Sequence, residues 1–328
     1  MSSQMANTLT YDTAGERDAA ALSELYHEYY PTLSWSPDYL RWQYFSNPAG
    51  NAQIWTARGG RKIVATFAAV PHRISVKGKP GIGHRMQDAF TRPEYRGFGI
   101  YHTMSRLTRD YLEKPVFPFN FAFPNEKSYT GFVKMGWKPL FRIPLWILSE
   151  VDALQAPPVI AKVSAVRRFD ASTDAIWRAH VRNFDFAVER DAAYLNWRYF
   201  ARPLAKYFAF RLTLGKEALV MVLKYYDRED GTRWAHVCDL FQSGVNAELA
   251  ISAVGHAIKF AQENRCRFVS CWSPAKNTLS SVLCCYPFVL QLDLNRWFVV
   301  NMNASEGQDD LWMQESRWHL SMGDSDVY

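Results

Sequence analysis

The chain has 328 residues, 48% of them hydrophobic and 21% charged, so it can bury a large core without disulfides and is longer than one typical domain. A net charge of +6 suits anionic small ligands, and the lack of any block of five Lys/Arg argues against a nucleic-acid-binding tail. Its apolar runs are too short to predict a membrane span, and its five cysteines lack metal-binding spacing, so we expect no metal and reduced thiols in a cytoplasmic protein.

The apolar patterns predict an α/β layered fold in two parts. In the first part we expect helices at 15–30 and 36–45, strands at 51–58, 61–76 and 81–91, a helix at 99–114, a strand at 116–123, a helix at 125–135 and a strand at 137–150. Residues 150–164 contain Pro157-Pro158 and predict a linker. The second part predicts strands at 232–242, 266–273 and 287–300 and helices at 246–263 and 275–284.

An internal repeat supports this division. Residues 39–48 read YLRWQYFSNP and residues 194–203 read YLNWRYFARP, with six of ten positions identical at an offset of 155. Each segment follows an amphipathic helical stretch and precedes strand-like runs, although aromatic-rich helices can also match by chance. The repeat predicts two tandem copies, 1–150 and 151–328.

A strand, a glycine loop and a helix follow one another over residues 86–112. The strand ends before Pro93, the loop reads Arg96-Gly97-Phe98-Gly99, and the following helix has an apolar face that begins at Ile100. Glycines let the backbone approach a ligand closely, and the free amides of a helix N-terminus bind anions such as pyrophosphate, so the loop predicts a phosphate site to which Arg96 adds charge. A plain tight turn is the alternative, because the loop is neither a Walker loop nor a complete GxGxxG.

This stretch resembles the pyrophosphate motif of the Gcn5-related N-acetyltransferase (GNAT) family, which Arg96, Gly97 and Gly99 match. Tyr101 stands where the family has a small residue, and FPNEKSYTGFVKMGW resembles a second family motif through Asn125. The resemblance implies tandem GNAT folds, each a mixed, mostly antiparallel sheet with a splayed parallel pair (here 81–91 and 116–123) flanked by helices. It also implies acetyl-CoA or a longer acyl-CoA as co-substrate, bound by Ala89, Phe90, Thr91, Arg96, Gly97, Phe98, Gly99, Ile100, Tyr101 and Asn125.

The second copy departs from this motif. Its equivalent segment, CDLFQSGVNAEL at 238–249, contains only Gly244 and no Arg-Gly-x-Gly. We therefore expect the second copy to bind no coenzyme A and to form a wall of the acceptor pocket.

Asp88 is the strongest candidate for a general base, because it lies near the end of the strand that would hold the thioester. A backbone N–H near Phe90 would stabilise the oxyanion. The family's usual tyrosine acid corresponds to Phe132 here, so Tyr129 is the candidate substitute, or no acid is required. His72 and His102 are weaker candidates for the base, and His72 also for binding substrate; Glu126 is interpreted as a favourable charge in a helix first turn.

The C-terminal segment WHLSMGDSDVY (318–328) predicts an aromatic strand followed by two acids. Together with the segment from Trp35 to Pro48, it resembles acyltransferases of surface polysaccharide synthesis. The resemblance implies a small-molecule amino-sugar acceptor, nucleotide-linked, with Asp324 and Asp326 binding its hydroxyls or amine; a solvated acidic tail is the alternative. Transfer from aminoacyl-tRNA to a peptidoglycan precursor and a non-catalytic acyl-CoA-binding module are the alternative functions. The oligomeric state and acyl chain length stay open.

Overall fold

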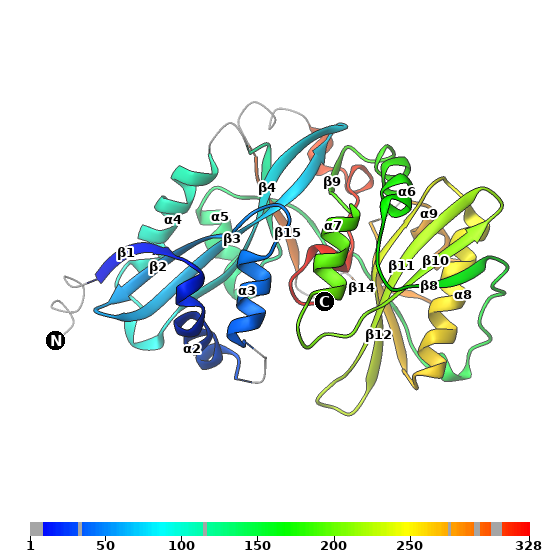
Figure 1. Cartoon of the computed structure of the whole chain (residues 1–328), viewed down its shortest axis with the longest axis horizontal. Helices are drawn as coiled ribbons and strands as arrows, with labels where there is room; N and C mark the ends of the chain where they lie inside the picture. The colour runs from blue at the N-terminus through cyan, green and yellow to red at the C-terminus, as the bar shows by residue number, and fades with distance from the viewer. Residues whose placement is uncertain (1–8, 32–34, 114–116, 275–276, 292–295, 303–309) are drawn as a thin grey trace.

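The computed structural model describes residues 9–31, 35–113, 117–274, 277–291, 296–302 and 310–328. They form two mixed sheets that lie next to one another, each flanked by helices (Figure 1). In spatial order the first sheet contains β1 (Leu9–Ala14), β2 (Gln53–Gly59), β3 (Lys62–Val76), β4 (Lys79–Thr91), β5 (Phe119–Ala122), β15 (Trp297–Met302) and β6 (Lys138–Arg142). The second contains β14 (Val289–Gln291), β7 (Leu145–Leu148), β13 (Phe268–Trp272), β12 (Arg233–Gln242), β11 (Glu217–Asp227), β10 (Phe208–Leu214) and β8 (Lys162–Val166).

Each half of the sequence contributes four of the described α-helices. The first half has α2 (Ala19–Tyr29), α3 (Pro37–Phe45), α4 (Ile100–Leu112) and α5 (Glu126–Lys134), and the second has α6 (Ala171–Val181), α7 (Ala192–Leu195), α8 (Ala247–Glu263) and α9 (Thr278–Leu283). A short polar side chain begins each repeated segment: Ser36 accepts a bond from the Tyr39 amide, and Asp191 accepts one from the Tyr194 amide. Such caps satisfy the free amides of a first turn, which is why the repeat folds as a helix in both copies.

Each sheet is antiparallel apart from one parallel pair, as the fold prediction requires. β4 pairs with β5 in parallel only at Arg85 and Phe121, and β12 pairs with β13 in parallel from Trp234 to Val237. Beyond these pairs the strands diverge, and a gap opens in each half. The predicted splayed pair at 81–91 and 116–123 is confirmed.

The two halves exchange one strand each. β7 follows β6 in the chain but lies in the second sheet, between β13 and β14, whereas β15 follows β14 and lies in the first sheet, between β5 and β6. We predicted single strands at 137–150 and 287–300; the first is divided at Pro144, which has no N–H to continue a ladder. Each sheet is therefore completed by the other half of the sequence.

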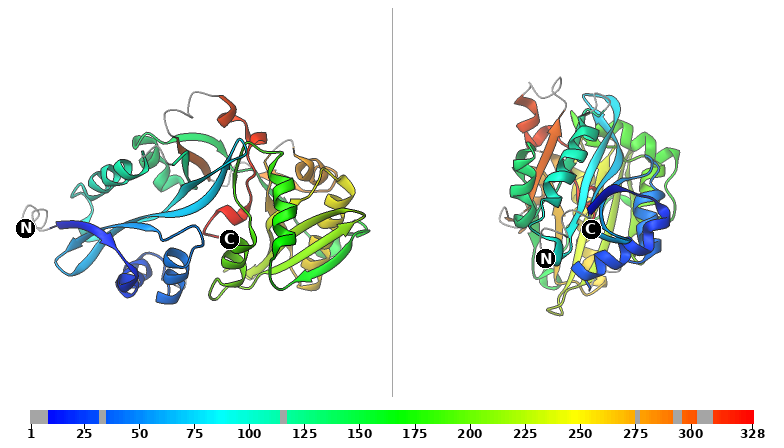
Figure 2. Two further views of the ribbon diagram at one scale, coloured as in Figure 1. Left: turned by 45° about the horizontal axis from the view of Figure 1, so that its top comes forward. Right: turned by 90° about the vertical axis from the view of Figure 1, so that its left-hand side faces the viewer.

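Further contacts tie the halves together. Trp42 donates from Nε1 to the Trp197 carbonyl at 2.8 Å, Trp197 donates to the Trp42 carbonyl at 3.0 Å, and the two rings stack at 5.1 Å. The same residue of each repeat thus contacts its counterpart reciprocally, as in a two-fold interface. β9 (Phe186–Val188), from the second half, pairs with the end of β3, which reaches toward it in Figure 2.

The predicted C-terminal strand is wrong. Residues Glu315–Arg317 and Met322–Asp324 form short 3-10 helices, and only an isolated bridge joins Trp318 to Phe186. Trp318 is 2% exposed, because the segment runs between the two halves and packs there by side chains. Among the described residues, no helix has the length and apolar character needed to cross a membrane.

Candidate functional site

The gap between β4 and β5 forms a cavity of about 340 Å³. Its walls come from the end of β4, the end of β5, the start of α5, the segment after α2 and the C-terminal segment. The lining residues are Tyr30, Trp35, Phe67, Arg85, Met86, Gln87, Asp88, Ala89, Phe90, Ala122, Phe123, Pro124, Asn125, Ser128, Phe132, Arg296, Asp326 and Val327. Four of the predicted residues therefore meet here with Asp326: Asp88, Ala89, Phe90 and Asn125.

Asp88 sits on a β-bulge of β4. The register with β3 shifts between Thr66 and Ala68, so that β4 carries one extra residue, and Asp88 has a φ of 54°. A left-handed conformation is uncommon outside glycine, although aspartate tolerates it, and bulges often turn a side chain toward a site. The bulge directs Asp88 and Ala89 into the cavity.

Three side chains hold the Asp88 carboxylate through one of its two oxygens. Gln43, Tyr44 and Gln87 each donate a hydrogen bond to Oδ2, from Gln43 at 3.0 Å and from Gln87 at 2.6 Å. Burial, followed by the negative charge of Asp326, raises the pKa of Asp88 to about 6. A carboxyl group with this pKa is ionised at neutral pH yet takes up a proton readily, which suits a general base.

Asp326 joins this cavity to a second one of about 460 Å³. Both cavities also share Trp35 and Val327. The second cavity has a basic and aromatic lining that includes Arg202, Lys206, Lys224, Tyr39, Phe208, Tyr225 and Tyr226. A molecule that spans both cavities would pass the carboxylates of Asp88 and Asp326 at one end and cations at the other.

The glycine loop has the predicted shape. Gly97 and Gly99 have φ values of 84° and 74°, and both face open space. Gly99 caps α4, whose first turn contains no acidic residue, and Gly99 supplies no side-chain cap. The first amides of α4 therefore have no side-chain acceptor, and the helix dipole favours an anion there. A pyrophosphate fits this loop.

Tyr29 holds the strand end next to the loop. Its hydroxyl donates to the Thr91 carbonyl and accepts from the Thr91 amide at 3.0 Å. Arg96 also donates to that hydroxyl, at 3.0 Å. Both backbone groups of Thr91 are thus occupied within the protein, so Thr91 does not offer the free amide that we expected for the cofactor. Arg96 remains exposed at the loop.

The substitution at Tyr101 is explained by its neighbour on α5. A Cβ at Gly131 would lie 2.3 Å from the Tyr101 hydroxyl oxygen, so the glycine makes room for the tyrosine. Phe98 is half-buried and Ile100 is 2% exposed in the core, so neither side chain faces solvent freely. Asn125 caps α5 by accepting from the Ser128 amide at 3.1 Å.

Tyr129 and His72 lie outside the cavity. The ring of Tyr129 stacks on that of Trp297, with 5.1 Å between the centroids. Tyr129 is not among the described residues that line the cavity. His72 is 1% exposed against the rings of Phe121 and Tyr194, and burial holds its pKa well below the ordinary value. We therefore correct both predictions: Tyr129 is not placed to act as the acid, nor His72 to bind substrate or serve as the base.

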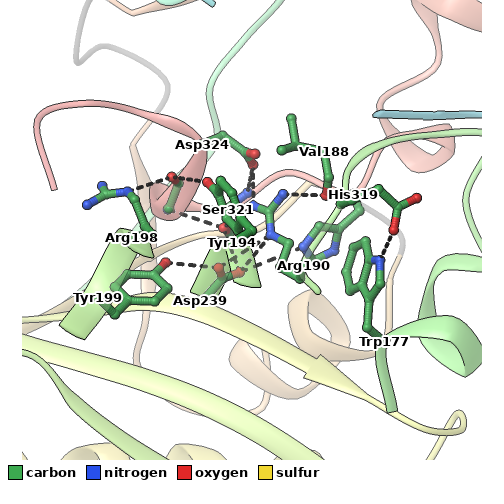
Figure 3. A network of polar contacts seen from close by, with 12 residues as sticks. Trp177, Val188, Arg190, Tyr194, Arg198, Tyr199, Asp239, His319, Ser321 and Asp324 are labelled. Carbon is green, nitrogen blue, oxygen red and sulfur yellow. Dashed lines mark hydrogen bonds and ion pairs between the residues drawn. The ribbon is translucent and has the colours of Figure 1, made fainter. Parts of the chain in front are cut away.

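Asp324 is also corrected. It is 1% exposed and lies 2.8 Å from the Arg190 guanidinium, and it accepts a bond from the Ser321 amide at 2.9 Å (Figure 3). A carboxylate that is committed to a buried ion pair is not free to bind a sugar. The runners-up His102 and Glu126 are exposed and outside the cavity lining.

Sequence reasoning missed the residues that hold Asp88. Tyr44 belongs to the repeated segment, and its counterpart Tyr199 also donates to an aspartate, Asp239, at 2.9 Å. The signal was available, because QDAF at 87–90 and CDLF at 238–241 share an Asp-x-Phe at nearly the same offset as the larger repeat. Arg85 and Arg296, which add positive charge to the cavity, had no recognisable pattern.

Residues 18–140 match the Acetyltransferase (GNAT) domain family. A search of curated proteins finds no match. Solved structures with a similar fold include a GCN5-related N-acetyltransferase from Anabaena variabilis, with 13% identity, a TM-score of 0.66 and coverage of 90% of this chain and 72% of that one. A conserved protein of unknown function from Enterococcus faecalis, described as a probable N-acyltransferase, has 12% identity, a TM-score of 0.66 and the same coverage. A GCN5-related N-acetyltransferase from Kribbella flavida has 12% identity, a TM-score of 0.59 and coverage of 90% and 71%. The first half of the chain is thus similar to a GNAT acetyltransferase domain, and GNAT domains in general take acyl-CoA as co-substrate.

Proposed function

We propose that this enzyme transfers an acyl group from acyl-CoA to the amine of a small anionic acceptor, a nucleotide-linked amino sugar used in surface glycan biosynthesis. The observation that carries the proposal is the meeting of Asp88 and Asp326 in one cavity at the end of β4, the strand that leads into the glycine loop. We place the reaction in the cytosol, where the five free cysteines stay reduced.

The loop and the cavity fit acyl-CoA at two points. The amides that follow Gly97 and Gly99 would bind the pyrophosphate, with Arg96 beside them. Strand residues Ala89 and Phe90 would pair with the amides of the pantetheine arm, because among the described residues β4 has no partner strand on that side beyond Arg85. The bound co-substrate supplies an activated acyl thioester at this position.

Asp88 would receive the proton of the acceptor amine. An ammonium group is attracted between the two carboxylates, but only the neutral amine attacks a carbonyl. Asp88, with its pKa of about 6, accepts the proton on the oxygen that Gln43, Tyr44 and Gln87 leave unbound, and Asp326 keeps the positive charge in place. The attacking nitrogen forms the C–N bond, the thiolate departs with the electrons of the broken C–S bond, and the second proton of the nitrogen passes to the departing thiolate to give the free thiol of coenzyme A.

A backbone amide at the bulge would stabilise the negative charge that develops on the carbonyl oxygen. The extra residue of a bulge is left unpaired across the ladder, so the amides around Ala89 and Phe90 have room to turn toward the cavity. Phe132 occupies the family's acid position and is 5% exposed in the core, so a low-pKa thiolate would leave without an acid.

The basic cavity beyond Asp326 indicates an acceptor with negative charge and a ring. Lys224 and Lys206 offer ammonium groups to phosphate, and Tyr225 and Phe208 offer faces on which a ring can stack. Burial lowers the pKa of Lys224, because its ammonium group is poorly hydrated. An anion beside Lys224 would replace the missing hydration and stabilise the charged form. A nucleoside diphosphate sugar with an amino group matches both cavities.

Thiol release tests this proposal with purified enzyme and acetyl-CoA or longer acyl-CoAs. We expect turnover with a nucleoside-diphosphate amino sugar and less with the phosphate-free amino sugar. Lys224→Met should raise KM for the nucleotide-linked acceptor about tenfold or more and leave KM for the free sugar unchanged. Lys216→Met, an exposed change outside the cavity lining, is the matched control.

Two outcomes would favour the alternatives. Binding of acyl-CoA without thiol release on any amine would indicate a non-catalytic binding module, consistent with Phe132 in place of the acid. Activity only with aminoacyl-tRNA would indicate the peptidoglycan-type transferase. The glycine loop argues against the latter, because that class commonly lacks it.

A further inference from the structure

The C-terminal segment, residues 321–328, brings one acidic residue to the junction of two cavities. Asp326 lines both the cavity that contains Asp88 and the basic cavity beyond it. Among the described residues no strand pairs with this segment, which contains one short 3-10 helix, Met322–Asp324. Its position therefore depends on side chains that bond to its backbone.

Five backbone carbonyls of this segment accept hydrogen bonds from side chains. They belong to Gly323, Asp324, Ser325, Asp326 and Tyr328. Three arginines supply most of these bonds, and they come from both halves of the sequence. Arg85 on β4 donates to the Asp324 carbonyl at 2.9 Å, and Arg198 and Arg202 belong to the repeated segment at 194–203. The segment is thus fixed by forked cationic donors.

Arg198 binds the backbone on both sides of Asp326. Its Nε donates to the Gly323 carbonyl at 3.2 Å, and its Nη2 donates to the carbonyls of Ser325, at 2.8 Å, and Tyr328. The side chain is 2% exposed, and none of the described acidic side chains forms an ion pair with it. A guanidinium is costly to bury unless its N–H groups are bonded, so these carbonyls stabilise Arg198 as much as Arg198 fixes them.

Arg202 binds Asp326 itself. It donates to the Asp326 carbonyl at 3.3 Å and also to the Tyr328 carbonyl. The Asp326 carboxylate, by contrast, has one side-chain donor among the described residues, Ser325 at 3.5 Å, which is near the limit of a hydrogen bond. The carboxylate is therefore placed through its backbone and is left open to a ligand.

The internal repeat shows what the second half contributes here. At the offset of 155, Arg198 corresponds to Gln43 and Arg202 to Asn47. Gln43 donates directly to Asp88 at 3.0 Å. The second copy has a longer, forked side chain at the matching position, which reaches the C-terminal backbone instead. The same position of each repeat thus serves one of the two carboxylates in the cavity.

We propose that Arg198 and Arg202 are positioning residues for Asp326, which hold its backbone so that the carboxylate lies where the two cavities join. In the proposed function, on which this inference rests, that carboxylate keeps the ammonium group of the acceptor beside Asp88. Lysine does not replace either arginine, because a single ammonium group lacks the planar fork that spans two carbonyls.

Asp88 reports the position of Asp326 without any substrate. Burial, followed by the charge of Asp326, raises the pKa of Asp88, so moving that charge away lowers this pKa. The other charged or titratable groups that interact with Asp88 come from β4, α2 and α3, and none of them changes in the variants below. They are Arg85, Tyr26, Tyr39 and Tyr44.

Carboxyl NMR of isotopically labelled aspartate measures the pKa of Asp88 in the whole chain, and Asp88→Asn assigns the signal. We expect Asp326→Asn to lower this pKa. Arg198→Lys keeps the positive charge and should also lower it, after which the added Asp326→Asn should change it little. Arg202→Lys should act in the same direction, and its half-buried position keeps the test open if Arg198→Lys does not fold.

Leu249→Ala is the control for a purely structural effect. Leu249 is 0% exposed in α8 and lines neither cavity, so the variant should lose stability in a urea titration and keep the wild-type pKa of Asp88. A folded Arg198→Lys or Arg202→Lys with the wild-type pKa of Asp88 would overturn the inference. An unchanged pKa in Asp326→Asn would do the same, since the two carboxylates would then not be neighbours.

Turnover provides the second measurement, with acetyl-CoA and uridine diphosphate glucosamine as probes. Asp326→Asn should lower kcat/KM about tenfold or more in the wild-type background and about threefold or less in Arg198→Lys, where the carboxylate is already displaced. Equal losses in the two backgrounds would show that Arg198 acts independently of Asp326 and would refute its positioning role. Absence of turnover in the wild type would count against the proposed function alone, because the NMR titration needs no substrate.

Discussion

Asp88→Asn should stabilise the protein while removing most of its activity. The folded protein raises the pKa of Asp88 from 3.8 to about 6, so the proton binds more tightly in the folded state than in the unfolded one. The stability that this provides is complete below pH 3.8 and is lost as the pH rises through about 6. A shift of this size corresponds to at most about 3 kcal/mol, and partial exposure of Asp88 to the cavity reduces the expected gain to about 1–2 kcal/mol.

Asparagine carries no charge at any of these pH values and still offers an oxygen to Gln43, Tyr44 and Gln87. We therefore expect Asp88→Asn to unfold at higher urea concentration than wild type at pH 8 and at nearly the same concentration at pH 4. In the proposed mechanism kcat falls by about 10²–10⁴. The wild-type pH profile of kcat/KM should decline below about pH 6, and the variant should lack this decline.

Asp239→Asn is the matched control, because it changes the same residue of the other repeat. The pKa of Asp239 is lowered, so its stabilising effect is present at neutral pH and is lost only in strong acid. Removing its charge leaves Arg190 with one partner fewer and should cost about 3–5 kcal/mol. Stability shifts of the same sign in the two variants at pH 8, or a flat wild-type profile between pH 5 and 7, would refute the reasoning.

Gly99→Trp should abolish coenzyme A binding in calorimetry, because the φ of 74° disfavours a side chain and the indole would cover the amides of α4. The control Gly78→Trp has a similar φ of 77° in an exposed turn and should bind coenzyme A normally. Equal affinity in both variants would exclude the loop as the phosphate site. Arg190→Met should lower the free energy of unfolding by about 3–5 kcal/mol, since it leaves Asp239 and a second buried carboxylate unpaired. Arg41→Met removes two exposed ion pairs and should change the free energy of unfolding by about 0.5 kcal/mol or less. A loss of similar size in both urea titrations would contradict the assignment of Arg190.

The sequence by itself determined the features that depend on neighbours along the chain. The glycine loop followed from Gly97 and Gly99, because left-handed backbone before a helix selects glycine locally. The repeated helices followed from their caps and apolar spacing. The position of Asp88 near the end of β4 followed in the same way, because its distance along the strand from the loop fixes where it lies.

Only the tertiary structure decided which groups are free to act. Asp324 and Asp326 are two residues apart in one acidic segment, yet Arg190 pairs with the first and the cavity exposes the second. Tyr129 turned toward Trp297, and β7 and β15 crossed to the opposite sheets. Burial, ion pairing and strand pairing depend on residues that are distant in sequence. A local sequence pattern cannot show which of these distant residues will be in contact, so it does not predict these features.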